Sequence, residues 1–177
     1  MVQNLPLCPC VHSCLGFLSW DQFDKSIDLL IAMNQPVYPI ISESSHTTYE
    51  FFSEGPKGII KKLIIFQKIA GNFFNLSLLD YNKDKEGYHD TKRSNNSDRN
   101  KVLSTVALAI LDFTKFHPKA VILIKGSTPS RTRLYQMAIA ANLKEINNLF
   151  SVEAFSGDIG EPFKKGKNYD EFIFTTR

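Results

Sequence analysis

An unbroken apolar run at residues 120–124 is the feature that most constrains how this chain can fold. The run reads Ala-Val-Ile-Leu-Ile, the pattern of a central strand that is buried on both faces. On either side, residues 101–116 and 129–142 space their apolar side chains three and four positions apart, as an amphipathic helix does. This order of helix, strand and helix predicts a βαβ-like middle with helices laid on a sheet.

The first predicted helix has recognisable ends. Asp98 or Asn100 is placed to cap it, and His117 followed by Pro118 is placed to stop it. Residues 82–100, ahead of the helix, contain almost nothing apolar and offer little surface to bury. We therefore expect a mobile loop there. In the second predicted helix, we expect an inward face of four apolar residues: Leu134, Met137, Ala138 and Ala141.

Segments rich in β-forming residues lie on both sides of this middle. They are residues 47–53, 59–69, 73–81, 150–155 and 169–175. Gly71 and Asn72 separate two of them and predict a hairpin, and residues 164–168 form a basic turn between the last two. The expected fold class is α+β, with a mainly antiparallel or mixed sheet, two helices and the order β-β-β-α-β-α-β-β.

We expect one domain at residues 33–177. Residues 1–32 carry three aspartates and one lysine, a net charge of −2. Since the whole chain has a net charge of +3, the remaining residues have a net charge of +5. Composition changes at Met33, so we interpret residues 1–32 as lying outside the folded core or as an over-extended gene start. Their cluster of Cys8, Cys10, His12 and Cys14 lacks the second ligand pair of a structural zinc site, so we expect no metal and no cofactor.

Composition excludes several protein classes. A chain that is 43% hydrophobic and 12% aromatic has enough apolar material for a core, which excludes overall disorder. No apolar run reaches the 18 residues that a spanning helix needs, and the start lacks the features of a secretory signal. Residues 33–177 contain no cysteine, which fits a reducing compartment. We expect a cytoplasmic protein with no membrane partner.

The turn after the apolar run has the features of an anion-binding loop. Gly126 permits backbone conformations that other residues avoid, Ser127 or Thr128 can cap the following helix, and Pro129 suits its first turn. Such a helix start presents backbone amides at the positive end of the helix dipole, where phosphates and carboxylates bind readily. Neither the Walker spacing nor a dinucleotide fingerprint is present, so the motif is of moderate specificity.

Two arginines strengthen this hypothesis. Cations in a first helical turn oppose the helix dipole unless an anion offsets them. We expect Tyr135, four residues after Arg131, to share its helix face and to stack on a base. The predicted anion contacts are Lys125, Gly126, Ser127, Thr128, Arg131 and Arg133. Glu50, Glu54 or Asp112 is the alternative, internal source of negative charge.

Lysines on the hairpin and in the last turn could extend a basic surface around this loop. They are Lys57, Lys61, Lys62, Lys68, Lys164, Lys165 and Lys167. The alternative is that they keep strand faces and turns solvated, which is the more common role of such residues.

Three segments carry a resemblance to a known group of sequences. They read Ser-Glu-Gly-Pro-Lys-Gly at 53–58, Lys-Gly-Ser-Thr-Pro-Ser-Arg-Thr-Arg-Leu-Tyr-Gln at 125–136 and Lys-Gly-Lys-Asn-Tyr at 165–169. Together they resemble a family of small bacterial domains of unknown function, over residues 33–177. Members of that family begin at the equivalent of Met33. The resemblance implies no activity and supplies no catalytic residue.

The leading functional hypothesis is a binding module for nucleic acid or another phosphorylated ligand. A second is an RNase-like or other phosphoester-cleaving enzyme of a small bacterial toxin module, with His117 as general base and Arg131, Arg133 and Tyr135 as a phosphate clamp. A third is a protein-interaction module for an acidic partner. The sequence contains no familiar catalytic motif, so it does not decide whether the protein is an enzyme.

Overall fold

The computed structural model describes residues 36–82, 87–89 and 96–177. The cysteine and histidine cluster at residues 8–14, and the expected boundary at Met33, lie outside these residues. Of the loop expected at 82–100, the described part includes a short strand and the start of a helix. The mobility of that loop stays a prediction.

The described chain forms nine strands and three helices. The strands are β1 (Ile41–Ser42), β2 (Thr48–Gly55), β3 (Gly58–Ala70), β4 (Phe73–Asn82), β5 (Gly87–His89), β6 (Val121–Ile124), β7 (Phe150–Ser156), β8 (Ile159–Pro162) and β9 (Glu171–Thr176). The helices are α2 (Arg99–Phe116), α3 (Pro129–Ala141) and α4 (Leu143–Leu149). The expected α+β class is confirmed, with one helix and three short strands more than predicted.

All nine strands belong to one mixed sheet. Their order is β1-β2-β3-β4-β6-β9-β7-β8, and β5 pairs with the C-terminal end of β4. Among the described strands β4 and β6 are the parallel pair, with Phe73 opposite Val121 and Leu76 opposite Ile124. Helix α2 makes the crossover between these two strands, as parallel neighbours require. The predicted hairpin at Gly71 and Asn72 is present between β3 and β4.

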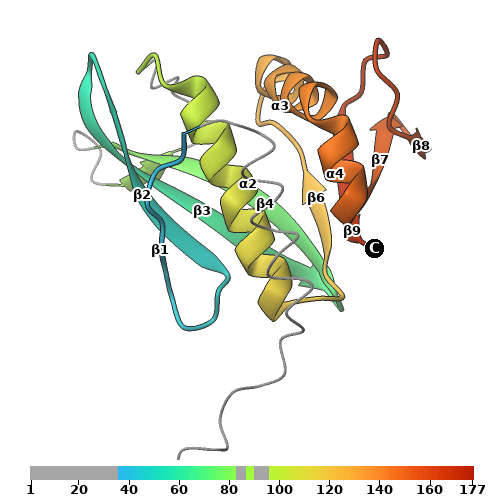
Figure 1. The fold of residues 1–177 in the computed structure, drawn as a ribbon, viewed down its shortest axis with the longest axis horizontal. Coiled ribbons are helices and arrows are strands. Elements are labelled where there is room, and N and C mark those ends of the chain that lie inside the picture. The colour runs from blue at the N-terminus through green and yellow to red at the C-terminus, as the bar shows by residue number, and fades with distance from the viewer. Residues whose placement is uncertain (1–35, 83–86, 90–95) are drawn as a thin grey trace, which may run out of the picture.

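The helices cover one face of the sheet (Figure 1). Helix α2 lies across β3 and β4, while α3 and α4 lie over β6, β9 and β7. Strand β6 is central, as predicted, but only Ile122 and Ile124 are buried, whereas Val121 and Leu123 on the other face are half-buried. The expectation of burial on both faces was therefore wrong, because no described helix covers the second face.

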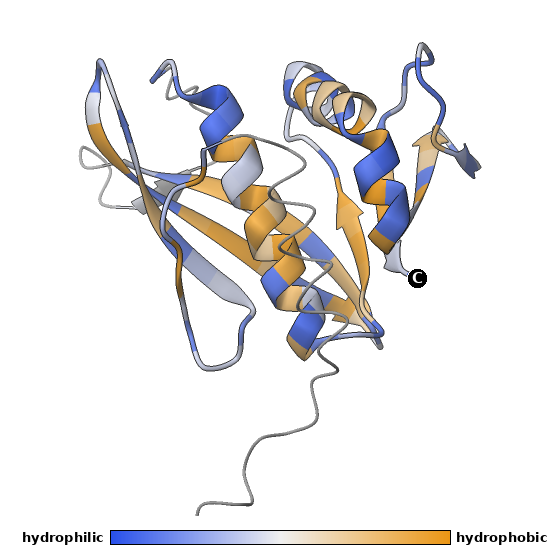
Figure 2. Ribbon diagram, viewed as in Figure 1, coloured by the Kyte–Doolittle hydropathy of each residue, from blue (hydrophilic) through white to orange (hydrophobic). Residues whose placement is uncertain are grey.

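The core lies between the sheet and α2, where the sequence is most hydrophobic (Figure 2). Phe66 of β3 stacks on Phe113 of α2 with ring centroids 3.9 Å apart, and Phe74 of β4 meets Phe113 edge to face. The large, fully buried side chains include Tyr49, Phe51, Phe66, Phe113, Ile64, Ile122 and Phe172. The apolar spacing of residues 101–116 thus places α2 as predicted, although the helix begins two residues earlier.

The start of α2 is fixed by Asn96, which is 2% exposed. Its amide nitrogen donates to the Ser53 hydroxyl at 3.1 Å and to the Gly58 carbonyl at 3.0 Å, and its Oδ1 accepts from the Lys57 backbone amide at 2.9 Å. A Cβ on Gly55 would lie 2.0 Å from the Asn96 carbonyl oxygen, so this close approach requires glycine. The β2–β3 hairpin therefore determines where α2 begins.

Gln136 fixes α3 to the loop between β8 and β9. Its Nε2 donates to the Lys167 carbonyl at 2.5 Å, and its Oε1 accepts from the Tyr169 amide at 3.4 Å. Gln136, Thr132 and Ile139 form the buried face of α3. The predicted inward face of Leu134, Met137, Ala138 and Ala141 was therefore wrong. At roughly 100° per residue it lies on nearly the opposite side of the helix, because Gln136 and Thr132 have specific partners on the buried side.

No helix among residues 36–82, 87–89 and 96–177 is long and apolar enough to cross a membrane.

Candidate functional site

The start of α3 has the predicted local chemistry. Thr128 is the N-cap residue, with an extended backbone, and its hydroxyl accepts from the Arg131 amide at 3.3 Å. Pro129 occupies the first turn, where its missing N–H removes no helical hydrogen bond. The cap and the proline predicted from the sequence are both confirmed.

The same turn already satisfies some of its own amides. The Gly126 amide donates to the Thr132 hydroxyl at 3.2 Å, and the Thr132 amide donates to the Thr128 carbonyl at 3.0 Å. A Cβ on Gly126 would lie 2.3 Å from the Thr132 amide nitrogen, so glycine is required for this close turn. An anion at this helix start would therefore be held mainly by side chains.

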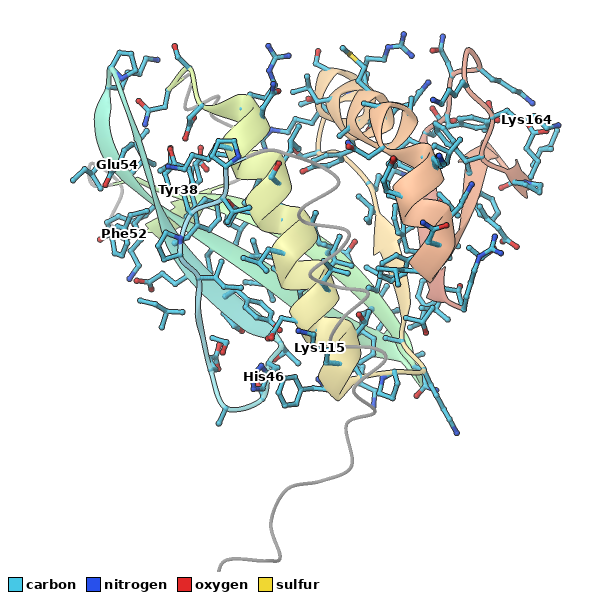
Figure 3. All side chains as sticks on the ribbon, viewed as in Figure 1. Tyr38, His46, Phe52, Glu54, Lys115 and Lys164 are labelled. Atoms are coloured by element: carbon cyan, nitrogen blue, oxygen red, sulfur yellow. The ribbon has the colours of Figure 1, made fainter. Side chains whose placement is uncertain are left out.

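Lys125 has an internal partner. Its ammonium lies 3.0 Å from the Glu171 carboxylate on the neighbouring strand β9. Of the carboxylates suggested by the sequence, Glu50 pairs with Lys61 at 2.6 Å. Figure 3 shows Glu54 on the other side of α2 from α3. The sequence did not reveal Glu171 because it lies 46 residues away.

Asp112 is engaged at the far end of α2. Its carboxylate accepts from the Tyr49 hydroxyl at 3.0 Å and lies 2.8 Å from His46 Nδ1. Burial raises the pKa of Tyr49, and the Asp112 charge raises it further, so the phenol stays protonated and donates. Asp112 is therefore part of a structural network around His46 (Figure 3) and does not serve the α3 start.

Arg131 and Arg133 diverge. They are two positions apart, which turns them roughly 200° around a helix. Arg131 Nη1 donates to the Ser127 hydroxyl at 3.0 Å, whereas Arg133 Nη1 donates to Asn168 Oδ1 at 2.9 Å. The structure thus keeps Arg131 beside the predicted loop and directs Arg133 toward the β8–β9 loop.

Arg131 lines a polar chamber of about 510 Å³ between the starts of α2 and α3. Its charged and hydroxyl-bearing walls include Lys62, Asp80, Asp98, Arg99, Ser130 and Arg131. The chamber lies over the C-terminal half of β4, through Leu78 and Asp80, past the carboxyl end of its parallel neighbour β6, the side on which α/β sheets commonly bind ligands. Both helices begin at this end of the molecule (Figure 1).

Arg99 is the site residue that the sequence reading missed. It is the first residue of α2, and neither α2 nor α3 has an acidic residue in its first turn. Among the described residues, no ion pair involves Arg99. Like Arg131, Arg99 is a cation in a first helical turn, but it was not predicted because the helix was expected to start at Lys101.

The chamber has a modest positive charge. Lys62, Arg99 and Arg131 face two carboxylates, which gives a net charge of +1 for its charged lining. The Lys62 ammonium is 2.5 Å from the Asp80 carboxylate, and Asp98 accepts hydrogen bonds from Ser53 at 2.5 Å and from Tyr38 at 2.9 Å. Both carboxylates thus have donors of their own.

An apolar chamber of about 350 Å³ adjoins the polar one between α2, α3 and α4. Arg99, Leu103, Leu134 and Tyr135 line both chambers, so the two are adjacent, and together they are called the cleft below. Tyr135 is half-buried and packs against the core. The predicted stacking residue therefore forms part of the wall where the two chambers meet.

Residues 34–177 match the model of a protein family described as a family of unknown function (DUF6934). The chain belongs to this family. The match covers all twelve elements described above. The expected resemblance to domains of unknown function is therefore confirmed. No curated protein and no solved structure matches the chain.

In this member of the DUF6934 family, the three segments that carried the resemblance frame the cleft. Residues 53–58 hold Asn96 and so fix the start of α2. Residues 125–136 form the start of α3, and residues 165–169 hold that helix through Gln136. The segments, far apart in the sequence, thus position the two helix starts on either side of one chamber.

The other predicted basic and catalytic residues lie elsewhere. His117 follows the end of α2, roughly 27 Å along the helix from Arg99 at 1.5 Å per residue over 18 residues. It lies 3.1 Å from the Ser45 carbonyl and stacks on Phe113. The structure therefore does not bring His117 together with Arg131 and Tyr135.

Two of the predicted surface lysines gather around one carboxylate. Lys164 and Lys167 both contact Glu161, and the Tyr169 hydroxyl donates to the same carboxylate at 3.0 Å. These hydrogen bonds, that of Lys164 first, lower the pKa of Glu161 to about 2. The cluster holds the β8–β9 loop at the opposite edge of the molecule from Tyr38 (Figure 3).

Proposed function

We propose that this domain is a binding module for a small phosphorylated ligand, held in the cleft between α2 and α3. The observation that carries the proposal is that Arg99 and Arg131, from the first turns of different helices, line one chamber. Two guanidinium groups match the oxygen atoms of a phosphate, and two positive helix ends favour the same anion. The Ser130 hydroxyl in the same wall adds a donor.

The distribution of charge favours a small ligand over a nucleic acid strand. A nucleic acid backbone needs cations along a track, and much of its affinity comes from displaced counterions. Here Lys61, Lys62, Lys125, Lys164 and Lys167 each contact a carboxylate. Arg99 is exposed, has no described carboxylate partner and lines the polar chamber together with Arg131, a setting that suits a single anionic group.

The test is isothermal titration of the protein with inorganic phosphate, pyrophosphate, a nucleoside monophosphate and a short single-stranded RNA. Arg99→Ala and Arg131→Ala each remove a charge-assisted hydrogen bond of about 1.5–3 kcal/mol, so each should weaken binding by about 10- to 150-fold. Arg133→Ala is the matched control, because it removes the same charge from the same helix on another face. It should bind within about twofold of wild type.

Equal losses in Arg133→Ala and Arg131→Ala would contradict the assignment to this chamber. RNA bound much more tightly than the mononucleotide, with a steep loss in salt, would favour a nucleic-acid surface instead. The absence of binding to any of these anions at millimolar concentration would end the proposal.

A further inference from the structure

Helix α3 turns its apolar side chains away from the core. Its buried face carries Thr132 and Gln136, whereas Leu134, Met137, Ala138 and Ala141 line the apolar chamber. Met137 is 53% exposed, although methionine is one of the residues that folded proteins most often bury. An apolar strip that a fold leaves facing a concave space indicates a contact surface.

The facing wall has the same character. Leu103, Ala107 and Leu111 of α2 line the chamber along about 12 Å of that helix. Ile124, Phe150 and Phe174 from the sheet are also among the lining residues. A chamber of about 350 Å³ with mostly apolar walls, both aliphatic and aromatic, has the size and composition of a small-molecule site.

The chemistry of the walls selects among ligands. A nucleobase has donors and acceptors on its edge, which lose hydrogen bonds to water unless the protein replaces them. The polar lining consists of Arg99 and Asn100 at the start of α2, the buried Ser104, Tyr135, and Asn142, whose amide nitrogen already donates to the Ala138 carbonyl at 2.9 Å. The other lining side chains are apolar. An aliphatic chain needs no such partners.

We infer that the cleft binds an anionic amphiphile, a soluble molecule with a phosphate-like head group and one aliphatic chain. The head group lies between Arg99 and Arg131, and the chain runs through the apolar chamber past Leu103, Leu134 and Met137. This inference rests on the proposed function for the head group. It adds the chain, which the adjacency of the two chambers supports, since Leu103 and Leu134 line both.

The experiment is a titration of the whole protein with n-alkyl phosphates from ethyl to octyl, below their micelle concentrations, alongside the matching alcohols. Burying one methylene is worth about fourfold in affinity, so binding should tighten about fourfold per added methylene until the chamber is full. Met137→Glu places a charge on the chamber wall at a half-exposed position. It should reduce the gain to less than about twofold per methylene.

Ile159→Glu is the matched control, since Ile159 is a 73% exposed apolar residue on β8 that does not line either chamber. It should keep the full dependence on chain length. The wild-type series decides the matter even where a variant fails to fold.

The outcomes separate the two ideas. If affinity does not depend on chain length but phosphate binding is still lost in Arg131→Ala, the inferred site for an aliphatic chain is wrong and the proposed function stands. Alcohols that bind as well as alkyl phosphates, with no effect of Arg131→Ala, overturn the anion site. Binding that rises with chain length in wild type and Ile159→Glu, but not in Met137→Glu, supports the amphiphile.

Discussion

Lys62 and Asp80 lie opposite each other across the β3–β4 pair, and the Lys62 ammonium is 2.5 Å from the Asp80 carboxylate. Their side chains are only 3% and 15% exposed, and both line the polar chamber. Taking two charges out of water is costly, so such a pair adds little net stability while intact. Removing one partner, however, takes the closest opposite charge away from a buried ion.

Asp80→Ala should therefore lower the free energy of unfolding by about 3–5 kcal/mol. Urea unfolding followed by far-UV circular dichroism measures this change. The double variant Lys62→Met/Asp80→Leu replaces the pair with apolar side chains and should recover most of the loss. A single variant that loses less than about 1 kcal/mol would show that water reaches the pair.

Gly55→Ala should be strongly destabilising, because the new Cβ would meet the Asn96 carbonyl oxygen at 2.0 Å. We expect a loss of about 3 kcal/mol, together with faster hydrogen exchange at the Lys57 amide, which donates to Asn96. Gly71→Ala is the comparison: its backbone has a φ of +48° but open space around it. It should cost about 1–2 kcal/mol through the backbone alone and leave the Lys57 amide protected.

Gln136→Leu should loosen the loop between β8 and β9. It removes the donor to the Lys167 carbonyl and the acceptor for the buried Tyr169 amide, at a cost of about 1–3 kcal/mol. Hydrogen exchange of the Tyr169 amide should speed up in proportion. Arg133→Ala, which removes an exposed contact to the same loop, should change neither stability nor exchange measurably. Unchanged protection at Tyr169 in Gln136→Leu would refute this role of Gln136.

Glu161 should stay ionised in the folded protein far into the acid range. Its folded pKa of about 2 lies below its ordinary value of 4.5, because Lys164, Lys167 and Tyr169 all donate to the carboxylate. A lowered pKa stabilises the fold above pH 4.5, and this contribution is lost as the pH falls from about 4.5 toward 2. Carbon-detected NMR of the Glu161 carboxyl should give a midpoint near 2.

The variant Glu161→Gln provides the corresponding stability test. It should unfold at a lower temperature than wild type at pH 7, and the difference should shrink as the pH falls from 4.5 toward 2. A difference in unfolding temperature that stays constant with pH would mean that the carboxylate contributes through packing and not through its charge.

Local patterns predicted much of the fold. The spacing of apolar residues in 101–116 predicted α2, and the unbroken run at 120–124 predicted the central strand β6. Thr128 and Pro129 were recognised as a helix start because capping depends on residues that are neighbours in the chain. The short strands β1, β5 and β8 were missed because strands of two to four residues carry too few positions for a period to show.

Only one of the two arginines of the candidate site was predicted from the sequence. Arg131 was found through its place in a helical turn, and Arg99 would have been found by the same rule had α2 been expected to begin there. That boundary depends on Asn96, whose buried side chain bonds to a hairpin about 40 residues earlier. No local pattern contains that contact.

By itself, the sequence determined the two longer helices and six of the described strands, the cap of α3, and the cation Arg131 in its first turn, since all of these follow from neighbours along one chain. Only the tertiary structure decided that Arg99 and Arg131 face one chamber while Arg133 faces another loop. The physical reason is the parallel pairing of β4 with β6, which sets two helix starts side by side. Specific partners for Gln136 and Thr132 then turn the apolar face of α3 toward the cleft.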